Sequence, residues 1–245
     1  MIPPMTTRRD VPERMEDRLI VALDVPSIGE ARRLIDELDG MVSFFKLGLW
    51  LQFAAGFDSL IEYLGDREKN IFLDSKMFDI GETVRQGVAR AAERGVSLVT
   101  VHGDRDIIRA AAEGKSGSNL KILVVPALTS LDANGLQQLG YRGGINELIV
   151  ARAKETLACG CDGIIAAPRD NPNEIRRSAE TEDLLVVTPG VRLRGTALDD
   201  HKRAGTPAEA IAAGADYLVV GRPIIRSGEP ARAAQAIIDD MRRAA

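Results

Sequence analysis

The sequence predicts an α/β protein that forms one (β/α)8 barrel. Short apolar runs alternate with longer amphipathic runs from residue 18 onward, and the 245-residue length is typical of a single barrel. The short runs are apolar on both faces, as buried parallel strands are. A doubly wound open sheet is the weaker alternative, because no Gly-x-Gly-x-x-Gly motif opens the first helix and eight units complete a closed barrel.

The expected strands are rich in Val, Leu and Ile, and Gly or Pro marks the joins between elements. We expect strands at 19–24, 43–48, 71–76, 98–103, 121–128, 162–167, 184–190 and 216–221. Amphipathic runs between and after them predict helices that include 28–38, 81–95, 145–160, 206–215 and 229–245. The barrel is therefore expected to span 18–245.

Residues 1–17 are polar and contain proline, which predicts a flexible N-terminal arm. Arg8 and Arg9 are not followed by the apolar segment of an export signal, so we expect a cytoplasmic protein.

The composition argues against several classes of function. Lys plus Arg number 32 and Asp plus Glu 36, so the basic excess of a nucleic-acid or anionic-membrane binder is missing. Aromatic residues make up only 4%, too few for base-stacking platforms, and no apolar run approaches the roughly 20 residues that span a bilayer. Cys159 and Cys161, with two histidines and no Cys-x-x-Cys pair, fit neither a disulfide framework nor a structural zinc site.

Ionisable side chains stand where the first four expected strands end. They are Asp24, Lys46, the pair Asp74 and Lys76, and His102. The C-terminal ends of barrel strands form the catalytic face, and buried charges need partners. This distribution predicts an active site at that face.

The densest cluster has the spacing Asp74-x-Lys76-x-x-Asp79. Because side chains alternate along a strand, Asp74 and Lys76 are expected on one face, with Asp79 reaching over from the following loop. Carboxylates beside Lys76 favour its ammonium form, which suits a proton donor better than a Schiff-base lysine. A purely structural ion-pair network at the strand ends is the alternative interpretation.

A second group of residues indicates an anion site. Gly221 and Arg222 follow the eighth strand, where a helix is expected to begin and its free N–H groups favour phosphate. The loop 190–203 carries Arg192 and His201 among its basic residues, and its length suits a mobile lid over an anionic ligand. A solvated basic loop is the alternative. Thr129, after the fifth strand, could bond a polar ring or simply form a turn.

Taken together and in order, these segments resemble the orotidine 5′-phosphate decarboxylase family. The matching motifs are VALDV at 21–25, FKLG at 45–48, FLDSKMFDIGETV at 72–84, VTVHG at 99–103, LTS at 128–130, VTPGVR at 187–192 and ADYLVVGRPI at 215–224.

The resemblance implies a barrel enzyme without cofactor or metal that converts orotidine 5′-phosphate to uridine 5′-phosphate and carbon dioxide. Lys76 matches the lysine that protonates C6, and Asp74 the aspartate placed against the substrate carboxylate. Asp24 and Lys46 match contacts on the ribose side, with Lys46 joining the charge network. Nucleotide would then be the small-molecule partner.

The resemblance also implies which other residues surround the nucleotide. Thr129 matches the pyrimidine contact, while Arg192, Gly221 and Arg222 match nucleotide-binding positions, with Arg222 on the phosphate. Related bacterial sequences commonly carry Gln where this chain has His201, whose protonated imidazole could still donate to phosphate.

A homodimer is a further implication of the resemblance. Asp79 and Thr83 match positions that the family supplies from the other subunit. Each active site is then expected to contain residues of both chains.

Two alternatives to this function stay open. Barrel lyases that act on sugar phosphates, such as ketogulonate-phosphate decarboxylase or hexulose-phosphate synthase, share the Asp-x-Lys-x-x-Asp spacing but need magnesium and typically carry an acidic residue in place of Lys46. The motifs at 45–48 and 187–192 favour the nucleotide enzyme. A barrel that only senses a phosphorylated metabolite is the other alternative, since fold alone does not determine function.

Overall fold

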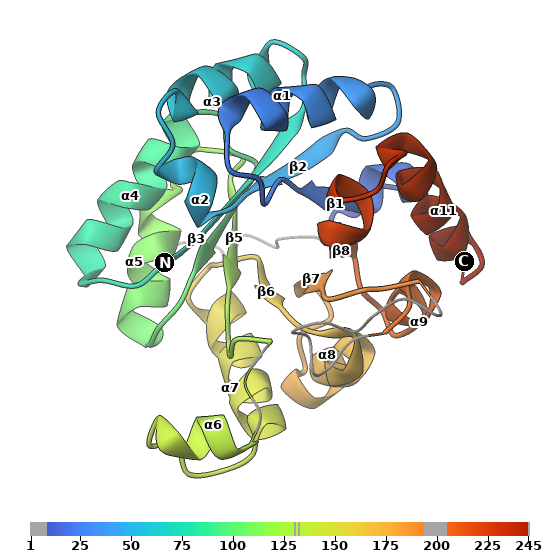
Figure 1. Ribbon diagram of the computed structural model, residues 1–245. Coiled ribbons are helices and arrows are strands. Elements are labelled where there is room, and N and C mark those ends of the chain that lie inside the picture. Colours follow the sequence, from blue (N-terminus) through green and yellow to red (C-terminus); the bar gives the residue numbers. More distant parts are fainter. Residues whose placement is uncertain (1–8, 130, 132, 194–204, 245) are drawn as a thin grey trace.

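Parallel strands close into a barrel in the part of the chain that the computed structural model describes, which is residues 9–129, 131, 133–193 and 205–244 (Figure 1). The eight strands there are β1 (Leu19–Ala22), β2 (Phe44–Leu47), β3 (Asn70–Met77), β4 (Leu98–Val101), β5 (Lys121–Val124), β6 (Gly163–Ile165), β7 (Leu185–Pro189) and β8 (Tyr217–Val220). Each pairs with its neighbours in sequence, and β8 pairs with β1. The predicted fold class is confirmed. The strands are shorter than expected except β3, which is longer by one residue at each end.

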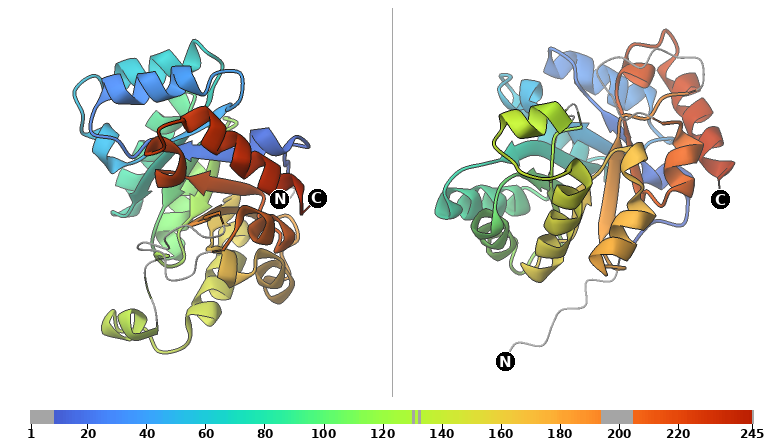
Figure 2. Two further views of the ribbon diagram at one scale, coloured as in Figure 1. Left: turned by 45° about the vertical axis from the view of Figure 1, so that its right-hand side comes forward. Right: turned by 90° about the horizontal axis from the view of Figure 1, so that it is seen from below.

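Helices surround the barrel on the outside (Figure 1). They are α1 (Ile28–Glu37), α2 (Leu49–Gln52), α3 (Phe57–Gly65), α4 (Gly81–Glu93), α5 (Arg105–Gly114), α6 (Ala133–Gln138), α7 (Ile145–Ala158), α8 (Pro172–Ala179), α9 (Pro207–Ala212), α10 (Arg222–Ile225) and α11 (Pro230–Arg242), with 3₁₀ turns η1 (Met15–Arg18) and η2 (Pro168–Asp170). The five helices predicted by residue range are all present. Figure 2 shows that α6 stands away from the barrel wall.

The local sequence explains how the helices begin and pack. Ser27 caps α1 by accepting a hydrogen bond from the Glu30 amide, and Asp104 caps α5 in the same way. In α1 the buried residues are Ala31, Leu34 and Ile35, spaced three and four apart, so one stripe of the helix faces the strands.

The strands carry two apolar layers because successive side chains point to opposite faces. The layer inside the barrel comprises Ile20, Ala22, Phe44, Phe72, Leu98, Leu123, Leu185, Val187, Tyr217 and Val219. The intervening residues, such as Val21 and Phe45, pack outward beneath the helices. Residues two positions beyond the inner layer therefore point into the C-terminal mouth of the barrel.

Strand β3 contains an irregular segment at residues 74–76. Leu73 pairs with Val99 and Met77 pairs with Val101, so β3 advances four residues while β4 advances two. Lys76 has a φ of 47°, in the left-handed region that non-glycine residues rarely adopt. Bulges of this kind re-aim side chains beside functional sites. Asp74 and Lys76 do lie on one face, as expected, but the irregular segment and not regular alternation places their side chains together.

Part of the segment predicted as an arm contacts the N-terminal end of the barrel. Arg9 Nε lies 2.8 Å from Asp216 Oδ1, and Lys121 Nζ donates to the Asp10 carbonyl at 3.3 Å. Val11 packs against the inner apolar layer. The boundary at residue 17 stays a prediction.

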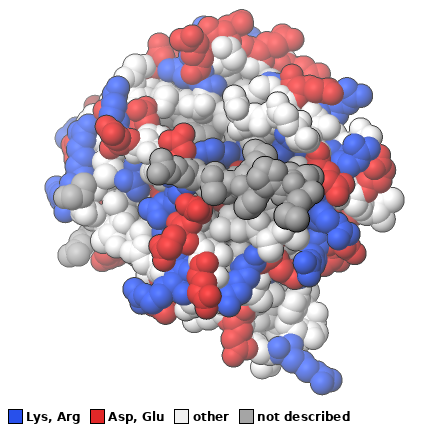
Figure 3. All heavy atoms as spheres, turned by 180° about the vertical axis from the view of Figure 1, so that it is seen from behind, with Lys and Arg blue, Asp and Glu red and all other residues white. Residues whose placement is uncertain are grey.

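The charged side chains are mixed over the face drawn in Figure 3, and neither sign forms a continuous surface there. Within the described ranges, no helix is long and apolar enough to cross a membrane.

Candidate active site

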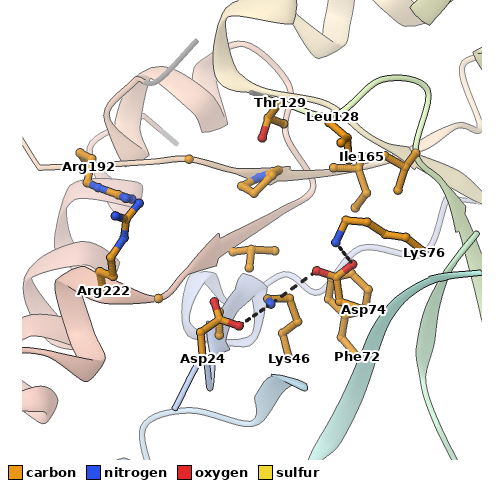
Figure 4. A pocket seen from close by; sticks show the side chains of 16 residues that line it. Asp24, Lys46, Phe72, Asp74, Lys76, Leu128, Thr129, Ile165, Arg192 and Arg222 are labelled. Atoms are coloured by element: carbon orange, nitrogen blue, oxygen red, sulfur yellow. Dashed lines mark hydrogen bonds and ion pairs between the residues drawn. The ribbon is translucent and has the colours of Figure 1, made fainter. Parts of the chain in front are cut away.

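A cavity of about 260 Å³ opens at the C-terminal mouth of the barrel (Figure 4). Its lining is Ala22, Asp24, Lys46, Phe72, Asp74, Lys76, Val125, Leu128, Thr129, Ile165, Pro189, Gly190, Arg192, Val219, Gly221 and Arg222. The inner layer explains this set, because Asp24, Lys46 and Asp74 each stand two residues after an inward apolar side chain.

Four charged side chains form a row of alternating sign along one wall of the cavity; we call Asp24, Lys46, Asp74 and Lys76 the charge row. Lys46 Nζ lies 3.0 Å from Asp24 Oδ1 and 3.4 Å from Asp74 Oδ2. Lys76 Nζ lies 2.8 Å from Asp74 Oδ1. Figure 4 shows Lys46 between the two carboxylates and Lys76 at the end of the row.

Burial differs along the charge row. The side chains of Lys46 and Asp74 are 10% and 15% exposed, whereas those of Asp24 and Lys76 are 50% and 38% exposed. The two central charges therefore hold each other in place, and the ammonium of Lys76 keeps an open side toward the cavity.

The electrostatics of Asp74 follow from these neighbours. Burial opposes its ionisation, but the positive charges of Lys46 and Lys76 and the hydrogen bonds from Lys76 and Thr100 outweigh that effect, so the pKa of Asp74 lies below its usual value. Asp74 is a carboxylate under ordinary conditions.

Gly48 is needed for the row to pack. A Cβ at this position would lie 2.7 Å from Asp24 Oδ1 and 3.3 Å from Lys46 Nζ. The glycine in the segment 45–48 thus leaves room for the first ion pair of the row.

Two guanidinium groups stand on the side of the cavity away from Lys76 (Figure 4). Arg192 is buried, and its Nη1 donates to the Val191 carbonyl at 2.8 Å. Arg222 is the first residue of α10, directly after Gly221, as the sequence predicted. Guanidinium groups bind phosphate through two parallel hydrogen bonds, so this end of the cavity suits a phosphate group.

The space between the arginines and the charge row has apolar walls. Phe72, Val125 and Ile165 line it, and Thr129 stands at its rim beside the half-exposed Leu128. These apolar walls were not predicted from the sequence. The period of two along the strands could have identified Val125, two residues after the inward-facing Leu123.

Asp79 and Thr83 are not brought into the cavity of their own chain. Both are exposed, and Asp79 Oδ1 accepts a hydrogen bond from the Ile80 amide at 2.7 Å. Neither Asp79 nor Thr83 lines the cavity. The expectation that Asp79 reaches over to Lys76 from the following loop is therefore not met within one chain.

The two histidines do not add to the described site. His102 Nδ1 lies 2.6 Å from the Val125 carbonyl, and its ring packs edge-on against Phe78, so it does not line the cavity. His201 lies outside the described residues, as does most of the predicted lid at 190–203.

No cluster of three or more His, Cys, Asp or Glu side chains that could hold a metal ion is found among the residues that the structure describes. Cys159 directly follows the last residue of α7, and Cys161 is buried just before β6.

Comparison with known proteins points to one family. The model of the "Orotidine 5'-phosphate decarboxylase / HUMPS family" matches residues 17–237. The chain is 44% identical over 228 residues to orotidine 5′-phosphate decarboxylase of Rhodopseudomonas palustris strain BisB5, covering 93% of this chain and 96% of the relative. It is 46% identical over 223 residues to the enzyme of that name from Cereibacter sphaeroides, covering 91% and 96%.

Solved structures superpose on most of the chain, and one of them carries the same name as these relatives. Orotidine 5′-phosphate decarboxylase from Lactobacillus acidophilus superposes with a TM-score of 0.80 at 31% identity, over 95% of this chain and 99% of that one. An uncharacterised conserved protein from Geobacillus kaustophilus superposes with a TM-score of 0.78 at 29% identity, over 91% and 99%.

Proposed function

Because this chain belongs to the orotidine 5′-phosphate decarboxylase family and converts orotidine 5′-phosphate to uridine 5′-phosphate, we infer that the charge row carries out this reaction. The observation that supports the inference is the position of Lys76. Its ammonium ends the row, 2.8 Å from Asp74 and open to a cavity that has arginines on its other side.

The proposed chemistry uses Lys76 as the proton donor. The bond from C6 to the carboxylate breaks, carbon dioxide leaves, and the electron pair stays on C6. The Lys76 ammonium stabilises that charge and then gives C6 its proton, after which the amine takes a proton from water. Lys46, held between two carboxylates, keeps Asp74 ionised and in place.

Asp74 would stand against the carboxylate of the substrate. Two carboxylates in contact repel each other, and the repulsion is relieved as carbon dioxide leaves. The lysines and hydrogen bonds that hold the pKa of Asp74 below its usual value oppose its protonation beside a second carboxylate.

The family resemblance supports an assignment for the rest of the nucleotide, and the residues concerned all line the cavity. Arg192, Gly221 and Arg222 would take the phosphate, with Asp24 and Lys46 on the ribose and Thr129 at the pyrimidine. Binding the phosphate far from C6 orients the ring and contributes to the rate of the chemical step.

We propose that the active enzyme is a homodimer in which Asp79 and Thr83 of the partner subunit complete each site. Phe78 and Ile80, on either side of Asp79, are apolar side chains that are 68% and 73% exposed. Exposed apolar side chains of this kind suit an interface between subunits. A second hollow runs from the charge row to the exposed side chains of Leu49 and Trp50 and offers an entry for a partner's carboxylate.

The reaction is tested by following the ultraviolet absorbance of orotidine 5′-phosphate with purified protein in the presence of a chelator. We expect conversion to uridine 5′-phosphate, and a loss of at least about 10³-fold in kcat for Lys76→Ala, because proton donation and charge stabilisation are both removed. Arg222→Ala is the matched control, with its main effect expected on KM.

A folded protein that does not convert orotidine 5′-phosphate, but that turns over a sugar phosphate when magnesium is added, would contradict the nucleotide assignment. Activity that disappears with chelator would contradict the metal-independent mechanism.

The shared site is tested by mixing two inactive variants, Lys76→Ala and Asp79→Ala. If each site uses Lys76 of one chain and Asp79 of the other, a mixed dimer has one intact site, and random exchange restores about a quarter of wild-type activity. Mixtures that stay inactive although subunits exchange would exclude the shared site.

The cytoplasmic location stays a prediction.

A further inference from the structure

We propose that Thr100 is a positioning residue whose buried hydroxyl holds Asp74 and Lys76 in the geometry that the reaction needs. The inference rests on the roles proposed above for Asp74 and Lys76. Thr100 is on β4 and points into the barrel, because Leu98, two residues earlier, belongs to the inner apolar layer.

The hydroxyl of Thr100 bridges the two reacting residues. The backbone amide of Lys76 donates to Thr100 Oγ1 at 2.9 Å, and Thr100 Oγ1 donates to Asp74 Oδ1 at 2.9 Å. A hydroxyl has a single proton to donate, so the contact with Asp74 uses it fully. Thr100 is completely buried, so water cannot easily replace either bond.

The backbone of the bulge needs such a partner. The regular pairing between β3 and β4 stops after Leu73 and resumes at Met77, and Lys76 lies in the left-handed region. Conformations of this kind persist only where the surroundings hold them, and they cluster at functional sites. Thr100 supplies the acceptor for the Lys76 amide within this gap.

The other side of the bulge is also held. Ser75 Oγ donates to Gln52 Oε1 at 2.9 Å, and Gln52 Nε2 donates to the Leu47 carbonyl at 3.2 Å. These bonds fix the middle residue of the bulge, whereas Thr100 contacts both residues that are proposed to act on the substrate.

The contact with Thr100 orients the charged carboxylate of Asp74 between the two lysines. Asp74 Oδ1 accepts from both Thr100 and Lys76 Nζ, and Oδ2 faces Lys46. Without the hydroxyl, Asp74 can rotate and the Lys76 amide has no acceptor. Lys76 then samples other positions, which lowers the rate of proton transfer while the phosphate end of the cavity stays intact.

The test compares Thr100→Val with Thr188→Val. Thr188 is a buried strand residue whose hydroxyl finds no hydrogen-bond partner among the described residues, and it does not line the cavity. For Thr100→Val we expect kcat to fall about 10-fold to 100-fold, as misplacement of a catalytic group does, with KM for orotidine 5′-phosphate within about threefold of wild type. Thr188→Val is expected to keep the wild-type kcat.

A second pair of variants isolates the hydroxyl if Thr100→Val does not fold. Thr100→Ser and Thr100→Ala both lack the methyl group and differ in the hydroxyl alone. We expect the serine variant to keep most of the wild-type kcat, and the alanine variant to be about 10-fold slower or more. Product affinity, measured by titration with uridine 5′-phosphate, should be similar for both.

The proposal is wrong if Thr100→Val keeps kcat within about threefold of wild type, if Thr188→Val loses as much as Thr100→Val, or if the serine and alanine variants are equally slow. These results leave the function itself untouched, since wild-type turnover and its loss in Lys76→Ala are measured in the same assay. A Lys76→Ala variant that retains activity would instead overturn the roles on which this inference rests.

Discussion

At the N-terminal end of the barrel, Asp216 is enclosed by arginine side chains, whereas at the C-terminal end Asp74 is flanked by lysines. Arg176 lies 2.5 Å from Asp216 and also donates to two backbone carbonyls, and Arg18 donates to two more. Asp216 in turn accepts from the Val186 amide at 2.7 Å. The charged groups here are paired with one another and with backbone groups, and we call them the closed cluster.

The charge row is built differently. Its ion pairs join side chains only, and the outer members Asp24 and Lys76 are open to the cavity. A guanidinium does not release its proton in proteins, whereas a lysine ammonium can. Both ends of the barrel therefore bury charge, but only the end that combines lysines with a cavity is equipped to deliver a proton.

Among substitutions at the two ends of the barrel, Lys76→Arg should have the largest effect, which is on kcat. The positive charge stays, but the proton is no longer available, so kcat is expected to fall about 10³-fold. Steady-state decarboxylation with a thermal unfolding control measures it. A kcat within tenfold of wild type would mean that charge alone is sufficient at this position.

Asp74→Asn should reduce stability in a pH-dependent way. The pKa of Asp74 is lower in the folded state than in the unfolded chain. Its carboxylate therefore stabilises the fold at pH values above the pKa of the unfolded chain. This contribution is lost as the pH falls through the pKa of the folded state. Replacing the carboxylate by an amide leaves Lys46 and Lys76 without a negative partner between them. We expect the free energy of unfolding to fall by about 2–3 kcal/mol near about pH 7 and by less near about pH 3.

Urea unfolding of Asp74→Asn and wild type at both pH values measures the difference. A difference in unfolding free energy that is constant with pH would show that the charge of Asp74 is not the cause.

Arg176→Lys is the matching change at the closed end. The charge stays, but several of the hydrogen bonds to backbone carbonyls and to Asp216 are lost, so we expect about 2 kcal/mol less stability. Since Arg176 does not line the cavity, kcat should be unchanged at temperatures where the protein is folded. A specific loss of kcat in folded protein would show that the two ends of the barrel are coupled.

Arg9→Ala should have the smallest effect. Its ion pair with Asp216 is at the edge of the closed cluster, where solvent weakens it, and about 1 kcal/mol or less is expected. Thermal unfolding of this variant tests whether the segment before β1 contributes to the barrel. A loss as large as that of Arg176→Lys would make Arg9 a central member of the cluster.

The order of the elements and much of the site could be predicted from the sequence. The apolar runs predicted each strand, and the charged residues that follow them predicted the mouth of the barrel that holds the cavity. The closed cluster could not be predicted, because Arg176 and Asp216 are far apart in sequence and no local pattern marks either residue as buried. Thr100 was missed for the same reason, since its role depends on a bulge in another strand.

By itself the sequence determined the fold class and the chemical character of the barrel mouth, because strand periodicity and the residues that end each strand are local properties. Only the tertiary structure decided how Asp74 and Lys76 meet. A regular strand would have placed them by alternation, but the register shift against β4 and the hydroxyl of Thr100 determine their geometry. The physical reason is that a bulge costs local backbone energy and is kept only by contacts with a neighbouring strand, which no single segment of sequence contains.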